Sequence, residues 1–159
     1  MAKAEATEEE AVQPRRAVDL NGQHSFKVDA KGRVALPATF RKVLSKDLVV
    51  TRELTDECIY VFEEPAFNDW VMELFEDKFG GYKASNREHV KLRRKIRGHA
   101  DSVEVDSSGR IMLKPEMREK TGISKEVLVV GNGDHFEIWD AQTYDRMDED
   151  VDLAVFYDD

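Results

Sequence analysis

The amino-acid sequence predicts an α+β fold, rich in β-strands, in which one small module occurs twice. The first indication is a phrase at residues 29–33 (DAKGR) that returns 77 residues later at 106–110 (DSSGR). Alternating apolar runs surround both phrases, and helix-like patterns lie between them. A duplication of this length indicates a repeated structural unit. Because a unit of roughly 45 residues seldom buries enough apolar surface to fold alone, the copies should share a core or several chains should assemble.

The first half begins with a segment that is rich in Ala and Glu and lacks aromatic residues, which is typical of disorder. Pro37 suits the first turn of a helix, because that position has no partner for a backbone N–H, and Phe40 starts an apolar stripe. The expected elements are a disordered acidic arm (1–19), strands (24–28 and 34–36), a short helix from Pro37 to Leu44, and a hairpin of two strands (48–51 and 58–62).

Two helices are expected between the copies, over residues 66–79 and 85–98. The first has apolar residues at helical spacing and ends at Gly80-Gly81. The second should begin at Ser85, since Ser85 and Glu88 have the spacing of a capping box. Its apolar set is thin and consists of Val90, Leu92 and Ile96.

The second half repeats the plan of the first. Asn132-Gly133 is a strong signal for a turn between two strands. The expected elements are strands (102–105 and 111–113), a short helix (115–122), a hairpin (127–130 and 136–139) and an acidic C-terminal tail (144–159). The modules should therefore occupy residues 20–65 and 99–143, with a helical connector over 66–98. The expected fold has helices both between and after the modules.

The charge of the chain is distributed unevenly. Of the formal net charge of −9, residues 1–12 carry −3 and residues 144–159 carry −6, so the middle is neutral overall. Within the middle, residues 83–97 hold seven basic residues and one acidic residue. Because local charge decides contact with nucleic acid, the net charge does not exclude a nucleic-acid-binding protein.

Several other classes of protein are disfavoured. The N-terminal sequence has no basic start followed by an apolar run, and no segment approaches the ~20 apolar residues of a membrane span, so a cytoplasmic protein without membrane partners is expected. Cys58, the single cysteine, lies in an apolar run and should be buried. No metal site, cofactor, small-molecule substrate or enzymatic activity is expected, because no nucleophile–base pair is visible and the four histidines lack metal-ligand spacing: His24, His89, His99 and His135.

The repeated phrase itself has turn chemistry. A glycine permits a positive φ angle and a tight reversal, and an aspartate three residues earlier can accept turn N–H groups or orient an arginine. The residues concerned are Asp29, Gly32 and Arg33 in the first copy and Asp106, Gly109 and Arg110 in the second. In both copies a further arginine follows eight residues after the arginine of the phrase. The pattern allows two interpretations: arginines held on a rim to meet phosphate or guanine, or an Asp–Arg clasp that only closes the turn.

The sequence around both phrases resembles the MraZ family of bacterial transcriptional regulators, in which two SpoVT/AbrB-type modules occur in tandem. The resemblance covers about Leu20 to Met147. Its matching residues are Gln23-His24-Ser25, residues 29–33, Pro37 and Phe40-Arg41 in the first half, and Gly98-His99-Ala100, Asp106, Gly109-Arg110 and Phe136-Glu137-Ile138-Trp139 in the second. The resemblance implies swapped hairpins that form an intertwined β-barrel, a ring-like homo-oligomer larger than a dimer, and association with the nucleoid. It also implies binding to tandem short G-rich repeats in double-stranded promoter DNA of the division and cell-wall gene cluster.

The expected DNA-contacting residues are Lys27, Lys31 and Arg33 in the first copy and Ser107, Ser108 and Arg110 in the second. Because the first turn has two cations and the second has one, Arg33 should contribute more to binding than Arg110. An AbrB-type partner-binding protein, antitoxin-like or a scaffold, is the alternative function. The basic helix from Arg87 to Arg97 is an alternative DNA surface, although a solvated face with a narrow packed stripe is favoured. The acidic tail is expected to be solvated, with autoinhibition by DNA mimicry as the alternative.

Overall fold

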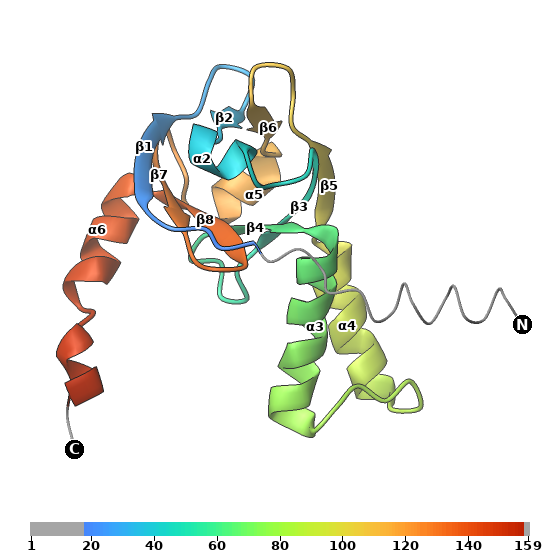
Figure 1. The fold of residues 1–159 in the computed structure, drawn as a ribbon. Helices are drawn as coiled ribbons and strands as arrows, with labels where there is room; N and C mark the ends of the chain where they lie inside the picture. Colours follow the sequence, from blue (N-terminus) through green and yellow to red (C-terminus); the bar gives the residue numbers. More distant parts are fainter. Residues whose placement is uncertain (1–17, 158–159) are drawn as a thin grey trace, which may run out of the picture.

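The computed structural model describes residues 18–157, which form a mixed fold of helices and antiparallel sheet (Figure 1). The predicted α+β class is confirmed. The arm predicted over residues 1–19 lies outside the described residues except for its last two. The first half contains β1 (Gln23–Lys27), β2 (Arg33–Ala35), α2 (Ala38–Arg41), β3 (Asp47–Arg52) and β4 (Ile59–Glu63). The connecting helices are α3 (Glu64–Phe79) and α4 (Arg87–Gly98).

The second half has the same order of elements. It contains β5 (Asp101–Glu104), β6 (Arg110–Met112), α5 (Pro115–Lys120), β7 (Glu126–Gly131) and β8 (His135–Asp140). Beyond β8 the sequence predicted a helix after the module and an acidic tail over 144–159, and the chain continues as α6 (Ala141–Glu149) and a 3₁₀-helix, η1 (Leu153–Tyr157). Helix α6 is capped by Asp140, whose Oδ2 accepts a hydrogen bond from the Thr143 backbone N–H at 3.3 Å.

The strands pair mainly across the two halves. The larger sheet has the order β1-β7-β8-β4-β3-β5, and a second sheet pairs β2 with β6. In these sheets β1 pairs with β7, β2 with β6, β4 with β8, and β3 with β5, always antiparallel. Neither half therefore has a complete sheet of its own, and the shared core expected from the small size of each module is observed.

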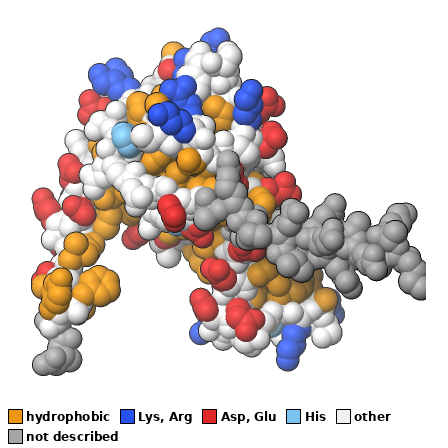
Figure 2. Space-filling model, in the orientation of Figure 1, with side chains coloured by type: hydrophobic (Ala, Val, Ile, Leu, Met, Phe, Trp, Pro, Cys, Tyr) orange, Lys and Arg blue, Asp and Glu red, His pale blue; other side chains and the backbone are white. Residues whose placement is uncertain are grey.

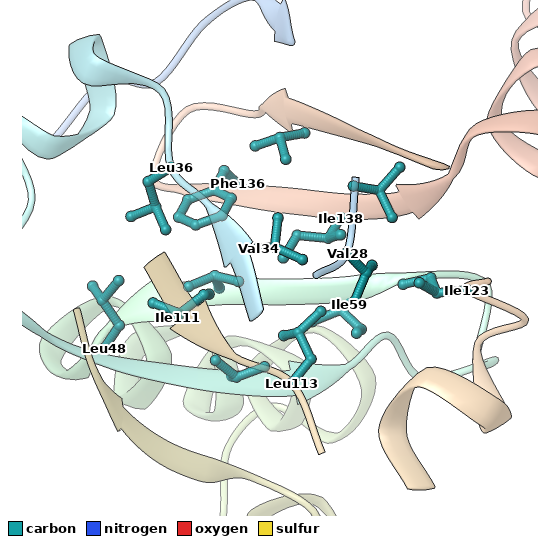
Figure 3. Packing of buried hydrophobic residues seen from close by; sticks show 14 of the residues in the cluster. Val28, Val34, Leu36, Leu48, Ile59, Ile111, Leu113, Ile123, Phe136 and Ile138 are labelled. Atoms are coloured by element: carbon teal, nitrogen blue, oxygen red, sulfur yellow. The ribbon is translucent and has the colours of Figure 1, made fainter. Parts of the chain in front are cut away.

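One hydrophobic core lies between the sheets and draws on both copies (Figure 3). Val34 of β2 and Ile111 of β6 are partners in register, and each is 1% exposed. Phe40 of α2 contacts Phe136 of β8 with ring centroids 5.3 Å apart. Because strand residues alternate between faces, these buried side chains leave their neighbours Arg33 and Arg110 on the outer side of the small sheet.

Helices α3 and α4 form a separate packed unit at one side of the larger sheet (Figure 1). Phe67, Val71 and Phe75 are buried at a spacing of four residues, as the helical pattern predicted. Gly80 ends α3 with φ +78°. The predicted capping box at Ser85 is wrong, because Asn86 accepts the His89 backbone N–H at its Oδ1 (3.2 Å) and so caps α4 one residue later.

The packed stripe of α4 also differs from the expectation. His89 is 4% exposed, whereas Leu92, which was assigned to the apolar set, is 38% exposed. The His89 Nδ1 accepts the Lys83 backbone N–H at 3.1 Å, and its ring lies 4.5 Å from that of Phe79 between centroids. The Arg93 guanidinium lies 4.3 Å from the centre of the Tyr82 ring. The helix therefore packs through a histidine and an arginine, which the pattern of apolar residues in the sequence does not include.

Two buried groups near β8 complete the fold. Cys58 is fully buried, as predicted, and burial raises the pKa of its thiol. The Glu137 carboxylate accepts hydrogen bonds at 2.9 Å from Asn132 Nδ2, Trp139 Nε1 and His135 Nε2. Burial alone would raise the pKa of Glu137, but these three bonds outweigh it and the pKa is lowered. The carboxylate therefore stays ionised and fixes the β7–β8 hairpin.

Candidate nucleic-acid interface

The two copies of the repeated phrase form two turns that lie side by side at one end of the molecule, at the top of Figure 1. In the first turn, Asp29 Oδ1 accepts the backbone N–H groups of Lys31 at 3.0 Å and Arg33 at 2.8 Å. Gly32 reverses the chain with φ +85° and donates its N–H to the Asp29 carbonyl at 3.0 Å. The phrase is therefore a turn held by its aspartate, as its residue types predicted.

The second turn has the same geometry. Asp106 Oδ1 accepts the backbone N–H groups of Ser108 and Arg110, both at 2.9 Å. Gly109 has φ +77° and donates its N–H to the Asp106 carbonyl at 2.9 Å. Backbone hydrogen bonds of 2.9 Å also join the turns to each other, from Leu36 to the Gly109 carbonyl and from Leu113 to the Gly32 carbonyl. The two turns are therefore parts of one rigid rim.

Ionic contacts cross from one turn to the other. Asp29 Oδ2 accepts hydrogen bonds from Arg33 Nε at 2.8 Å and from Arg110 Nη1 at 3.2 Å. Asp106 Oδ2 lies farther from both arginines, 3.5 Å from Arg110 Nε and 3.8 Å from Arg33 Nη1. Only Asp29 thus forms side-chain hydrogen bonds with the arginines of both copies.

The electrostatics of the turns follow from these bonds. The Arg33 backbone N–H, with its side chain and the Lys31 N–H, holds the pKa of Asp29 below its ordinary value. The Arg110 backbone N–H does the same for the pKa of Asp106. The four charged side chains are between 25% and 34% exposed, so they form a clasp that still reaches solvent. Both interpretations of the phrase, clasp and rim, describe part of the geometry.

The structure brings most of the predicted site residues together. Asp29, Arg33, Asp106 and Arg110 are in contact, with Gly32 and Gly109 at the bends. Lys31, Ser107 and Ser108 are exposed on the turns, and Lys27 is exposed at the end of β1. Figure 2 shows Lys and Arg side chains gathered at this end of the molecule. Because the two Asp–Arg pairs balance in charge, Lys27 and Lys31 contribute a positive excess to the rim.

Two further arginines belong to this site, Arg41 and Arg118. A Cβ atom on Gly32 would lie 2.9 Å from Arg118 Nη2, and one on Gly109 would lie 2.5 Å from Arg41 Nη1. Each arginine therefore packs over the bend of the opposite copy. Arg118 is fixed further by donation from its Nε to the Leu113 carbonyl at 3.1 Å. The signal was present in the sequence as the second repeated arginine, but its spacing gave no reason to place it on the other turn.

The basic helix α4 lies away from the two turns, at the lower right of Figure 1. Arg97 lies 5.2 Å from the centre of the Phe67 ring and donates to Asn68 Oδ1 at 3.1 Å. With Arg93 over Tyr82, two of its basic residues take part in packing against the α3 region. This geometry agrees with the favoured interpretation of a narrow packed stripe.

The described part of the chain has no cluster of metal-ligating side chains and no membrane-spanning helix. Over residues 18–157, no group of three or more His, Cys, Asp or Glu side chains could hold a metal ion. In the same residues, no helix combines the length and the apolar character needed to cross a membrane.

The fold and the site define a duplicated α+β protein whose halves exchange strands and present two arginine-bearing turns at one end. The model of a family described as "MraZ protein, putative antitoxin-like" matches residues 20–86 and 96–155. The chain belongs to the MraZ family.

Curated relatives support the same assignment, and each is named a transcriptional regulator MraZ. The protein of Sodalis glossinidius is 35% identical over 86% of this chain and 90% of its own length. The protein of Burkholderia cenocepacia is 36% identical over 82% of this chain and 88% of its own. The protein of Nitrosococcus oceani is 33% identical over 80% of this chain and 85% of its own length. The similarity thus extends over nearly the whole of both chains.

Proposed function

We propose that this chain is a transcriptional regulator that binds double-stranded promoter DNA through the two turns. The observation that carries the proposal is the rigid rim, in which Asp29 holds Arg33 and Arg110 side by side. Fixed arginines lose little conformational entropy when they meet a guanine edge or a phosphate. The names of the relatives support the regulatory role.

The free edges of the two guanidinium groups suggest different roles. Arg33 is held through Nε, and within the described residues no hydrogen bond occupies its Nη1 or Nη2. Those two nitrogens can donate together to O6 and N7 of guanine. In Arg110, by contrast, Nη1 donates a hydrogen bond to Asp29, and Nε is buried without a hydrogen bond among the described residues. Arg33 is therefore the better base-reading residue, with the exposed Lys31 beside it for a phosphate.

The remaining features of the proposal come from the family. They are an intertwined β-barrel of swapped hairpins, a ring-like homo-oligomer larger than a dimer, tandem short G-rich repeats in the promoter of the division and cell-wall gene cluster, and a cytoplasmic, nucleoid-associated location. The exchange of strands between the halves and their single core support the intertwined modules. Several rims on one assembly would bind tandem repeats more tightly than one repeat, because the second contact is made at high effective concentration.

The proposed division of the chain keeps modules at 20–65 and 99–143, with a connector at 66–98. The acidic segments at 1–19 and 144–159 would flank them. Because the sheets combine strands from both modules, each module would depend on the other for folding.

The test is a binding titration of the full chain against fragments of its own division-cluster promoter that carry one, two or more repeats. We expect tighter binding as repeats are added, and a salt dependence of about −0.9 in log K per phosphate neutralised. Lys91→Ala on α4 is the matched control, since it removes an exposed cation far from the turns. Equal affinity for one repeat and for several would overturn the proposal. Absence of binding to all fragments would favour a partner-binding protein instead.

A further inference from the structure

The C-terminal segment, residues 151–157, exposes a run of large apolar side chains. These are between 54% and 91% exposed, and they are Val151, Leu153, Val155, Phe156 and Tyr157. Figure 2 shows them as a hydrophobic patch at the lower left of the molecule. A run of exposed apolar side chains of this kind marks an interaction surface.

The first half of the chain shows how the equivalent segment is covered. Helix α3 directly follows β4 and helix α6 directly follows β8, at the same place in each copy. Helix α4 packs on α3, where His89 contacts Phe75 and Phe79 with ring centroids 5.5 and 4.5 Å apart. After α6, residues 153–157 of the segment form η1, and within residues 18–157 no further helix packs over it as α4 packs over α3. The duplicated plan therefore leaves this segment without the cover that its counterpart has.

A groove on the other side of the molecule has the matching apolar surface. It has a volume of about 840 Å³, within the ordinary range of binding pockets, about 300–1,000 Å³, and it lies between α3, α4, α5 and the β3–β4 turn. Leu54, Phe79 and Leu92 line this α3/α4 groove and are 56%, 41% and 38% exposed. Leu92, expected in the packed stripe of α4, instead places an apolar side chain on the wall of the groove.

The charges of the groove complement those of the segment. Lys78, Lys95 and Lys120 line the groove, and no ion pair within residues 18–157 engages them. Of its three acidic residues, Asp56 pairs with Arg52 at 3.5 Å, so three lysines face two carboxylates, Glu53 and Glu116, and the groove keeps a small positive excess. The segment is flanked and interrupted by acidic residues, which are Asp148, Glu149, Asp150 and Asp152. An apolar groove with three lysines at its wall thus complements an apolar segment with acidic neighbours in this chain's own sequence.

We propose that residues 151–157 of one copy dock in the α3/α4 groove of a second copy. A second copy is required because α6 and the α3–α4 pair lie on separate sides of the molecule and the segment runs away from the groove (Figure 1). Each copy then supplies one segment and one groove, which is a head-to-tail contact that closes into a ring if the rotation permits. The inference rests on the proposed function, since it names the contact that builds the ring. The turns at the other end stay free for DNA.

The first experiment measures the mass of the full chain in solution by light scattering, without DNA. The segment variant is Phe156→Asp with Tyr157→Ser, and the groove variant is Leu92→Glu with Lys95→Glu. We expect each to weaken assembly by more than about tenfold, because apolar anchors and charge pairs are lost together. Met72→Glu is the matched control, since Met72 is 46% exposed on α3 but does not line the groove. All three should keep the wild-type melting temperature within a few degrees, because the positions are exposed.

The second experiment mixes the segment variant with the groove variant. The groove variant supplies an intact segment and the segment variant supplies an intact groove. We therefore expect the mixture to form a heterodimer, whereas neither variant alone forms a dimer. Docking of the segment in its own chain would yield no heterodimer and would overturn the proposal, as would wild-type assembly of either variant.

The outcome is separable from that of the DNA-binding proposal. Arg33→Ala should assemble like the wild type, since Arg33 lies at the far end of the molecule. If assembly follows the segment and the groove but DNA is not bound, only the proposed function fails. If DNA is bound through Arg33 but the segment and groove variants assemble normally, only this inference fails.

Discussion

Arg110 donates from its Nη1 to Oδ2 of Asp29, 3.2 Å away and 81 residues earlier in the chain. The same oxygen accepts Arg33 Nε at 2.8 Å, so one carboxylate orients the arginines of both turns. Asp106, its counterpart, has only longer contacts with the side chains of these arginines. The two copies of one phrase are therefore joined by an unequal pair of carboxylates, and the inequality has measurable consequences.

Asp29→Asn should lower the melting temperature and weaken DNA binding more than Asp106→Asn. Both substitutions weaken charge-assisted bonds from backbone N–H groups to Oδ1. Only the first also weakens side-chain hydrogen bonds to two arginines, whereas the second affects longer side-chain ion pairs. Because the pKa of both carboxyls is lowered in the folded protein, their contribution is present above the ordinary value of 3.8 and is lost as the pH falls through the folded value. The measurement is the melting temperature of both variants at neutral pH. Identical changes in melting temperature would contradict the idea that Asp29 holds the arginines of both turns.

Arg33→Ala should weaken specific DNA binding more than Arg110→Ala. Loss of a bidentate guanine contact costs about 1–3 kcal/mol, or roughly 5- to 150-fold in Kd, and Arg33 has the freer guanidinium edge. Anisotropy titrations with a labelled promoter fragment compare the two variants, with Lys91→Ala as the control for loss of one positive charge. Equal losses would mean that both turns read DNA alike.

Gly109→Ala should destabilise the protein more than Gly80→Ala, although both glycines have φ near +78°. The left-handed conformation alone costs an alanine about 1–2 kcal/mol. A Cβ at position 109 would also meet Arg41 Nη1 at 2.5 Å, whereas a Cβ at position 80 has nothing within 4 Å. Urea unfolding of the two variants separates the backbone cost from the contact. The idea that Arg41 packs on the bend fails if the two free energies of unfolding change by the same amount.

The stability of the β7–β8 hairpin should fall as the pH rises through the folded pKa of His135. Burial alone would lower this pKa, but hydrogen bonds from the ring to Glu137 at 2.9 Å and Asp134 at 2.8 Å raise it above 6.5. A raised pKa gives a contribution that is complete below the unfolded value and is lost above the folded one. Melting temperatures between about pH 6 and pH 9 should decline in the wild type and stay flatter in His135→Gln. Parallel curves would contradict the prediction, because they would show that titration of His135 does not contribute to stability over this range.

Local chemistry explains which parts of the fold the sequence predicts. The turns at Gly32 and Gly109 and the strands beside them follow from residue types within a few positions, and they are observed where expected. The bond between Asp29 and Arg110 does not follow, because it depends on which strands pair across the two halves. The same reason hid Arg41 and Arg118, whose spacing is local but whose contacts lie on the opposite copy.

Two other differences arise from packing that residue type does not encode. His89 is buried because its ring fits between Phe75 and Phe79, while Leu92 points toward the groove. The segment after Asp140 is mostly polar in sequence. Tyr144 within it is nevertheless buried, and its hydroxyl accepts a hydrogen bond from Gln23 Nε2 at 3.0 Å. Charge counts describe the average of such a segment and miss the few side chains that anchor it.

Because the two halves exchange strands, the single chain has the arrangement that two separate copies of one module would form as a dimer. Two separate copies of one module would present two identical turns and would dissociate on dilution. A single chain keeps its halves together at any concentration and lets each turn change without the other. Lys31 beside Arg33, and Ser107 and Ser108 beside Arg110, are differences that a symmetric pair of identical modules has no means to encode.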